Sequence, residues 1–160
     1  MFEITEARSP SELREFVAFP ETLYRSHPHY VPKLFRDELA TLDRAKNPAF
    51  AYCDARYWLA RRGGTPVGRI AGIINRRYIE IWKSRRARFG WVDFVDDPEV
   101  SAALFSTVES WARERGLEAV HGPLGFCDLD REGMLVDGFD ELDMLVTNYN
   151  YPYYPAHLEH

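Results

Sequence analysis

The order of the predicted elements places the chain in the α/β class, with a mixed central sheet flanked by helices. Two observations carry this prediction. Apolar runs on both sides of Gly63 and Gly64 predict a β-hairpin, and a helical stripe that begins at Pro98 lies between two further strand patterns. A helix between two strands is typical of a crossover that joins parallel neighbours. With 160 residues, 46% of them hydrophobic, residues 1–160 are expected to form one domain with its own core.

The N-terminal part is predicted to begin with a short strand and to continue into a capped helix. Residues 2–7 alternate between apolar and polar side chains, as in a strand with one buried face. Ser9 and Glu12 have the spacing of a capping box, so a helix is predicted over residues 10–19. Pro20 has no amide hydrogen and is expected to end or kink this helix.

The middle of the chain holds a short helix and the strongest strand patterns. The helix is predicted over residues 33–42. Residues 56–61 and 67–74 are aromatic and aliphatic and flank a two-glycine turn, which predicts the two strands of the hairpin. Residues 89–95 alternate between two faces and predict another strand, in which Gly90 indicates a bulge or a close approach of backbone.

A longer helix and a strand follow. Asp96 or Asp97 is expected to cap a helix that starts at Pro98, and Gly116 is expected to terminate it. Its apolar stripe at helical spacing comprises Val100, Leu104, Val108, Trp111 and Ala112. Residues 118–121 then predict the strand that this helix connects to the preceding one.

The remaining part has a weaker pattern. Residues 124–148 are rich in glycine and acids, which indicates a long excursion, and long loops in compact domains are often functional. Within it, residues 134–136 and 144–146 each have the composition of a short strand. Asn150 or Tyr151 is the expected start of a last short helix.

The net charge of −5 conceals a strong segregation of charge along the chain. Residues 61–88 carry nine basic side chains and one acidic, whereas residues 89–160 carry three basic and fifteen acidic. We expect the basic block to pack against the acidic C-terminal part. A phosphate-bearing small ligand and a nucleic acid are the alternatives, but no nucleic-acid partner is expected because an acidic chain repels a polyanion.

Composition and missing motifs argue against several classes of protein. No apolar run approaches the ~20 residues that span a bilayer, and no signal peptide is visible, so no membrane partner is expected. Cys53 and Cys127 fit reduced thiols in a cytoplasmic protein. The acids of residues 128–133 resemble the first half of a calcium-binding loop, but the loop lacks its last ligand. His27 and His29 have no further ligand at the right spacing and fit a turn. No metal site is therefore predicted. The motifs of serine hydrolases, P-loop NTPases and zinc proteases are absent.

Four tyrosines lie close together near the C-terminus: Tyr149, Tyr151, Tyr153 and Tyr154. Packing of the large rings is the favoured interpretation, because a buried tyrosine can keep its hydroxyl paired or wet. The alternative is that one phenol acts as a general acid or that a ring lines a ligand slot. Their spacing does not decide between the two.

Several short segments match one protein family. They are Tyr30-Val31-Pro32, Asn47-Pro48, Val67 to Gly72, Phe89-Gly90, Gly122-Pro123, Gly138-Phe139-Asp140 and Tyr149-Asn150. Together they resemble an uncharacterised bacterial family of N-acetyltransferase-like proteins in the GNAT (acyl-CoA N-acyltransferase) superfamily. The resemblance implies a GNAT-like mixed sheet and an N-acyltransferase that takes acetyl-CoA or another acyl-CoA as co-substrate and an unidentified amine as acceptor.

The resemblance also implies roles for individual residues. The backbone of Phe94 and Val95 would bind the pantetheine arm of the co-substrate. Asp93 would be the catalytic base, acting through a water, and Tyr153 or Tyr154 would be the catalytic acid. The alternative for Asp93 is a solvent-facing strand residue paired with an arginine of residues 61–88.

Two departures from the superfamily suggest an alternative function. The segment Asp96 to Glu99 stands where related acetyltransferases have a glycine-rich loop whose amides bind the CoA pyrophosphate, and its three acids oppose phosphate binding. Proteins of this family are also longer, so the chain resembles an N-terminal portion that lacks the last strands. The alternative is a non-catalytic GNAT-like module of a larger protein, with an exposed apolar surface that pairs with a further domain or in a homo-oligomer.

Overall fold

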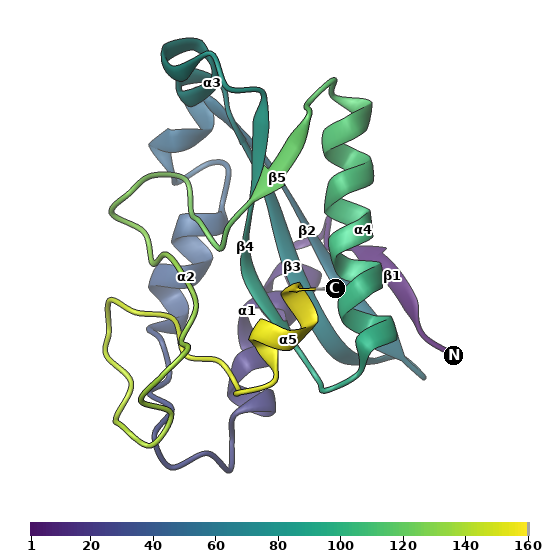
Figure 1. Cartoon of the computed structure of the whole chain (residues 1–160), viewed down its shortest axis with the longest axis vertical. Coiled ribbons are helices and arrows are strands. Elements are labelled where there is room, and N and C mark those ends of the chain that lie inside the picture. The colour runs from purple at the N-terminus through teal and green to yellow at the C-terminus, as the bar shows by residue number, and fades with distance from the viewer. Residues whose placement is uncertain (160) are drawn as a thin grey trace.

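The computed structural model describes residues 1–159, and its centre is a five-stranded mixed sheet in the order β1-β2-β3-β4-β5 (Figure 1). The strands are β1 (Glu3–Glu6), β2 (Cys53–Arg62), β3 (Thr65–Asn75), β4 (Arg86–Phe94) and β5 (Ala119–His121). Neighbours from β1 to β4 are antiparallel. β5 runs parallel to β4, to which it is connected through the crossover helix α4 (Pro98–Glu114). The predicted α/β class and the crossover are therefore confirmed.

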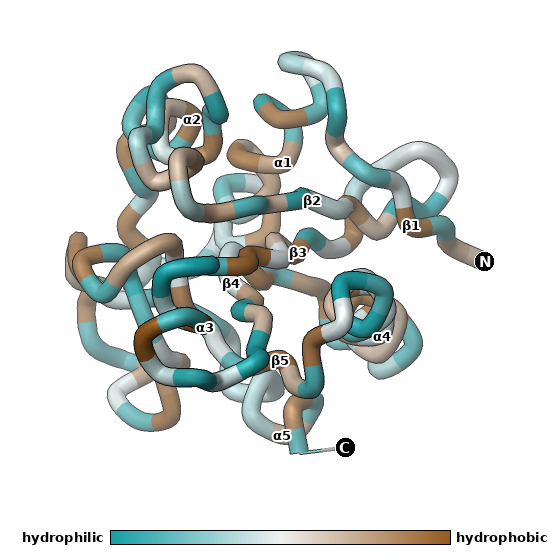
Figure 2. The backbone as a smooth tube through the Cα atoms, turned by 90° about the horizontal axis from the view of Figure 1, so that it is seen from above, coloured by the Kyte–Doolittle hydropathy of each residue, from teal (hydrophilic) through white to brown (hydrophobic). Residues whose placement is uncertain are grey.

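The helices lie on both faces of the sheet. Besides α4 they are α1 (Pro10–Leu23), α2 (Phe35–Leu42), α3 (Arg76–Trp82), α5 (Tyr154–Leu158) and the 3-10 turn η1 (Pro48–Ala51). Seen from above, α1 and α2 cover one face, and α4 and α5 cover the other (Figure 2). The result is a three-layer arrangement with the sheet in the middle.

Each face of the sheet has its own apolar core. On β2, Trp58 and Ala60 pack in the core that includes α4, whereas Tyr57 and Leu59 pack in the core that includes α1. Successive side chains of a strand point to opposite faces, so a continuous apolar run is what a strand covered on both faces requires. This explains why residues 57–60 of β2 and 70–74 of β3 are apolar without alternation.

The contact between α4 and β3 depends on two glycines. A Cβ atom at Gly68 would lie 2.8 Å from the Leu104 side chain, and one at Gly72 would lie 2.8 Å from the ring of Trp111. Neither approach is possible for a real side chain, so glycine at both positions lets the helix lie directly on the strand.

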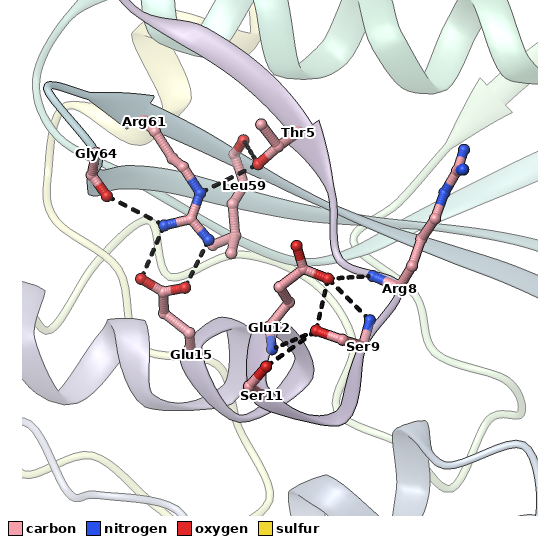
Figure 3. A network of polar contacts seen from close by, with 9 residues as sticks. All are labelled: Thr5, Arg8, Ser9, Ser11, Glu12, Glu15, Leu59, Arg61 and Gly64. Atoms are coloured by element: carbon pink, nitrogen blue, oxygen red, sulfur yellow. Dashed lines mark hydrogen bonds and ion pairs between the residues drawn. The ribbon is translucent and has the colours of Figure 1, made fainter.

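A network of polar contacts fixes the start of α1 against the sheet (Figure 3). The Ser9 hydroxyl accepts a hydrogen bond from the Glu12 amide, and the Glu12 carboxylate accepts from the amides of Ser9 and Arg8. The predicted capping box is thus confirmed. One turn later, the Glu15 carboxylate binds the Arg61 guanidinium of β2 through two hydrogen bonds, which anchors the helix to the strand.

Pro20 was expected to end or to kink α1. It does not end the helix, which continues to Leu23. A proline inside a helix removes one amide donor and leaves the carbonyl four residues earlier without its helical partner. That carbonyl belongs to Phe16, and it finds a partner outside the helix, as described below.

The excursion after β5 is confirmed, but the two short strands predicted within it are wrong. Residues 134–136 and 144–146 have no strand partner in the described part of the chain, and Val136, Leu145 and Val146 are exposed. Without a buried face, an apolar composition is not enough to form a strand. The last helix begins at Tyr154, three or four residues later than expected.

Other local predictions are confirmed. Asp97 caps α4, and Gly116 follows its end with φ of 72°. Gly90 permits a close approach of backbone, because a Cβ atom there would lie 2.5 Å from the Leu124 carbonyl oxygen. Cys53 and Cys127 are both free thiols.

The basic block packs against acids from both ends of the chain. Arg62, Arg69 and Arg85 pair with C-terminal acids, as expected: Asp97, Asp93 and Glu118 respectively. Two other arginines pair instead with N-terminal acids: Arg61 with Glu15 and Arg76 with Asp54. The segregation of charge along the sequence is therefore partly neutralised in the fold.

Candidate functional site

The centre of the candidate site is a buried ion pair between β3 and β4. The Nε atom of Arg69 lies 2.7 Å from Oδ2 of Asp93, and both side chains are at least nine-tenths buried. The two residues are directly paired in the sheet, as are Ala71 and Gly90. One residue of β3 therefore lies opposite two of β4, and Trp91 in this bulge has a φ of 43°. Such bulges re-aim the side chains that follow them.

The Arg69 guanidinium also explains how α1 tolerates Pro20. Its Nη1 atom donates to the Phe16 carbonyl at 2.9 Å, the carbonyl that Pro20 leaves without a helical donor. One guanidinium thus ties the α1 backbone to the carboxylate of β4. A buried charge needs such fixed partners, because an unpaired one would be very costly.

A chain of hydrogen bonds leads from Asp93 to the backbone of β4. The Tyr24 hydroxyl donates to Asp93 Oδ1 at 2.8 Å and lies 2.8 Å from the Tyr154 hydroxyl, which accepts from the Phe94 amide at 2.9 Å. A phenol has one proton. Because Tyr24 gives its proton to Asp93, Tyr154 must be the donor to Tyr24. Each group therefore donates to the next in the order Phe94 amide, Tyr154 hydroxyl, Tyr24 hydroxyl and Asp93 carboxylate.

Burial controls the protonation of these groups. Loss of solvent raises the pKa of Asp93 above its ordinary value, although the Arg69 charge and the Tyr24 hydrogen bond act in the opposite direction. Burial likewise raises the pKa of Tyr24 and of Tyr154 well above 10, with the nearby Asp93 charge as a further cause. Both phenols are consequently neutral hydrogen-bond donors at physiological pH.

This chain of groups forms part of the wall of a cavity of about 260 Å³. The cavity lies between α1, α2, the end of β4 and the excursion that follows β5. Arg69, Asp93, Tyr24 and Tyr154 line it together with Trp91 and apolar residues of the excursion. A concave site with a few convergent polar groups is the usual form of a small-molecule site.

The excursion forms the opposite wall of the cavity, and ion pairs to Lys33 and to α2 hold it in place. Lys33 Nζ lies 2.8 Å from Asp143 Oδ2 and also donates to two carbonyls of the excursion. Glu38 of α2 accepts from the guanidinium of Arg131 and, at 2.7 Å, from the indole of Trp91. These contacts order a segment that has no regular secondary structure of its own.

The predicted site residues fall into two groups. Asp93 and Tyr154 line the cavity and are joined through Tyr24. The backbone groups of Phe94 and Val95 instead have partners inside the protein. Phe94 donates to Tyr154 and accepts at 2.5 Å from the hydroxyl of Tyr153, whereas the Val95 amide donates to Val67. Binding of a pantetheine arm by Phe94 and Val95 stays a prediction, and it requires Tyr153 and Tyr154 to leave Phe94 and the Val95 amide to leave Val67.

The start of α4 is occupied by carboxylates of the chain itself. Asp97 accepts from the Glu99 amide at 3.0 Å and pairs with Arg62 at 2.6 Å, and the Arg62 hydrogen bond is the main reason that its pKa is lowered. Asp96 lies 2.9 Å from Nε2 of His157, whose other nitrogen meets the Ser101 hydroxyl. The helix end that attracts anions therefore already holds its own negative charge.

Other motifs from the sequence lie outside this site. His27 is in a turn, as expected, and its ring contacts the Tyr149 hydroxyl at 2.7 Å. Asp130 of the calcium-like segment accepts from the Phe126 amide at 2.7 Å, which is a local turn contact. Within residues 1–159, no group of three or more His, Cys, Asp or Glu side chains is arranged to hold a metal. No helix of that part is long and apolar enough to cross a membrane.

Sequence reasoning overlooked Tyr24 and named Arg69 only as a member of the basic block and of the family segment Val67 to Gly72. One signal was present for Arg69, because it interrupts an apolar run with a charge that a buried strand must pair. No local signal existed for Tyr24, whose two hydroxyl partners are 69 and 130 residues away.

Comparison with known proteins gives two curated relatives. No family model matches the chain. Protein YghO from Escherichia coli K12 is 34% identical over 149 residues, and a bacterial ceramide synthase from Caulobacter vibrioides is 32% identical over 148 residues. The alignments cover 93% and 92% of this chain, but the chain spans 38% of the length of each relative.

Several solved structures have a similar fold. A tandem GNAT protein from the clavulanic acid biosynthesis pathway superimposes with a TM-score of 0.55 at 18% identity, over 72% of this chain and 34% of that one. A GNAT-family acetyltransferase from Staphylococcus aureus gives 0.53 at 15% identity, over 75% and 71%. AAC(6')-Iy, solved with the bisubstrate analogue CoA-S-monomethyl-acetylneamine, gives 0.53 at 14% identity, over 76% and 78%.

The chain therefore has the fold of the GNAT acetyltransferases. The resemblance inferred from the sequence is confirmed at the level of the fold.

Proposed function

We propose that the chain contributes the amine-binding site of an acyl-CoA-dependent N-acyltransferase. The observation that carries the proposal is the position of Asp93, on the wall of a cavity at the end of β4 and joined through Tyr24 to Tyr154. The fold supports it, because structures of the same fold include acetyltransferases solved with acetyl-CoA or a CoA conjugate. One relative is named a bacterial ceramide synthase, and a ceramide contains an amide, the bond that the proposed reaction would form.

The reaction needs one base and one hydrogen-bond donor. The amine nitrogen attacks the thioester carbonyl, the carbon–sulfur bond breaks, and the amine proton leaves while the thiolate of CoA takes up a proton. Asp93 accepts the amine proton through a water in the cavity. A raised pKa suits this role, since it makes the carboxylate a stronger base.

Tyr154 is the better placed of the two candidate acids, because it lines the cavity and Tyr153 does not. Its raised pKa means that it holds its proton more tightly than a thiol with an ordinary pKa of ~8.5 holds its own. In the structure Tyr154 gives its one proton to Tyr24, so we assign it the role of hydrogen-bond donor to the developing charge once substrate has displaced that contact. Complete proton transfer to the thiolate is left to solvent.

The acids at the start of α4 favour a second candidate, the non-catalytic GNAT-like module. Asp96, Asp97 and Glu99 stand near amides that would otherwise be available to a pyrophosphate, and the Asp97 carboxylate occupies one of them. A module of this kind would bind an unidentified ligand or a partner domain without catalysing acyl transfer. The large exposed apolar side chains of the described residues lie mostly on α3 and on the excursion.

Calorimetric titration of the chain with acetyl-CoA and with free CoA separates the two candidates. An acyltransferase is expected to give heat and a thermal shift with millimolar acetyl-CoA, and both signals should persist in the Asp93→Asn variant while turnover is lost. Absence of heat and of any thermal shift would contradict the acyltransferase and leave the module as the function of this chain.

A further inference from the structure

Helix α3 has an apolar surface that the rest of the described chain does not cover. The helix is seven residues long and contains no buried residue. Ile81 and Trp82 are each 70% exposed, although both are large apolar side chains. The helix stands at one end of the molecule, beyond the ends of β3 and β4 (Figure 1). Side chains of this size are usually buried or in contact with a partner.

Exposed basic side chains precede and follow the apolar pair in the sequence. They are Arg76, Arg77, Lys83, Arg85 and Arg86, and the one acid in this stretch is Glu80. Arg76 and Arg85 form ion pairs with Asp54 and Glu118. Within residues 1–159, neither Lys83 nor Arg86 takes part in an ion pair. Their charge is therefore available to an external anion.

Three acids, Glu80, Asp54 and Glu118, accompany the basic side chains at α3, whereas the acids of the excursion lie elsewhere. The excursion, which carries acids from Asp128 to Asp143, extends toward the opposite end of the molecule from α3 (Figure 1). The overall charge of −5 consequently coexists with a local positive surface around α3. Over distances beyond about 8 Å at physiological salt, the remote acids are screened from a partner at α3.

In contrast to the expectation of no membrane partner, we propose that α3 and its basic flanks dock on an anionic lipid bilayer, lying on the surface of the membrane without crossing it. Tryptophan and aliphatic side chains enter the interfacial region, and flanking Lys and Arg side chains bind anionic headgroups. A nucleic acid fits less well, because it could stack on Trp82 but offers no apolar environment to Ile81. The proposal rests on α3 alone and is independent of the proposed function.

Co-sedimentation with lipid vesicles tests the proposal. The 160-residue chain is mixed with vesicles of phosphatidylcholine alone or with about a third phosphatidylglycerol, at low and at physiological salt. Binding is expected to the anionic vesicles only and to weaken with salt. The Ile81→Ser/Trp82→Ser variant should lose about tenfold or more in partition coefficient. The Lys83→Glu/Arg86→Glu variant should lose at least roughly 25-fold, at about fivefold for each basic residue removed, and the two added acids act in the same direction.

Matched controls separate a local surface from a general effect. Val136→Ser/Leu142→Ser removes two apolar side chains of the excursion that are about as exposed as Ile81 and Trp82. Arg14→Glu/Arg25→Glu reverses two exposed charges, one within α1 and one just after it. Both controls should bind as the unchanged chain does. Because all these positions are exposed, circular dichroism is expected to show a folded protein in every case.

Three outcomes would overturn the proposal. The first is no binding to anionic vesicles, and the second is an equal loss in the controls. The third is a salt-dependent gel shift with an oligonucleotide, or a dimer that Ile81→Ser/Trp82→Ser dissociates, in a chain that leaves vesicles unbound. That result would assign α3 to a nucleic acid or to a second copy of the chain.

Discussion

The hydroxyl oxygens of Tyr24 and Tyr154 lie 2.8 Å apart, although 130 residues separate them in the sequence. Tyr24 ends α1 on one face of the sheet, and Tyr154 begins α5 on the other. Their contact joins the two layers of helices around the end of β4. It also connects the Asp93 carboxylate to the Phe94 amide through an unbroken series of donors.

Removal of the Tyr24 hydroxyl should be costly. Tyr24→Phe leaves one oxygen of a buried carboxylate without its donor, so the free energy of unfolding is expected to fall by about 1–3 kcal/mol in urea denaturation. Tyr30→Phe is the matched control, because Tyr30 also lines the cavity and its hydroxyl has no partner within residues 1–159. Equal losses in the two variants would show that the hydrogen bond to Asp93 is unimportant.

The ion pair between Arg69 and Asp93 should show strong coupling. Arg69→Met leaves a buried carboxylate unpaired and is expected to cost about 3–5 kcal/mol of unfolding free energy. In Arg69→Met/Asp93→Asn the charge is also removed, so the loss should be smaller than the sum of the single losses by about 1 kcal/mol or more. Arg76→Met, which breaks an exposed pair with Asp54, should cost about 1 kcal/mol or less. Additive losses would contradict the coupling.

The acids before α4 should weaken the binding of CoA phosphates. Asp96→Asn/Asp97→Ser removes two negative charges but keeps a capping side chain, and the affinity for free CoA is expected to rise about tenfold. Glu109→Gln/Glu114→Gln makes the same change in net charge further along α4 and should leave the affinity nearly unchanged. The dissociation constants come from calorimetry, and a rise in both variants would indicate a general effect of charge.

The start of α1 should make the protein sensitive to acid. The pKa of Glu12 is held below its ordinary value near 4.5, first by the Ser9 amide, then by the Ser9 hydroxyl and the Arg8 amide. An acid whose pKa is lower when folded stabilises the fold above its ordinary pKa, and this contribution is lost as the pH falls through the folded pKa. Glu12→Gln should therefore reduce the fall in Tm between neutral pH and about pH 3. In Glu114→Gln, which removes an exposed acid, the fall should be unchanged.

The elements that sequence reasoning predicted correctly are those with a local cause. The capping box at Ser9, the turn at Gly63 and Gly64, and the stripe of α4 depend on neighbours within a few residues. The apolar segments 134–136 and 144–146 lacked a partner strand, and no local pattern reports the absence of one.

The site was predictable only in part, because its contacts are distant in sequence. Asp93 and Tyr154 were proposed from a family resemblance, and the structure places both on the cavity. Tyr24 and Arg69, which connect them to each other and to α1, have partners at least 24 residues away. The effect of Pro20 was misjudged for the same reason, since the donor to the Phe16 carbonyl comes from β3.

The most direct test of the proposed active site is the release of the CoA thiol from acetyl-CoA in the presence of primary amines. The unchanged chain is expected to release thiol faster than the uncatalysed mixture, and Asp93→Asn should lose at least about a hundredfold of that rate. Thiol release at the uncatalysed rate with every amine, or an equal rate with Asp93→Asn, would contradict the assignment of Asp93 as the base.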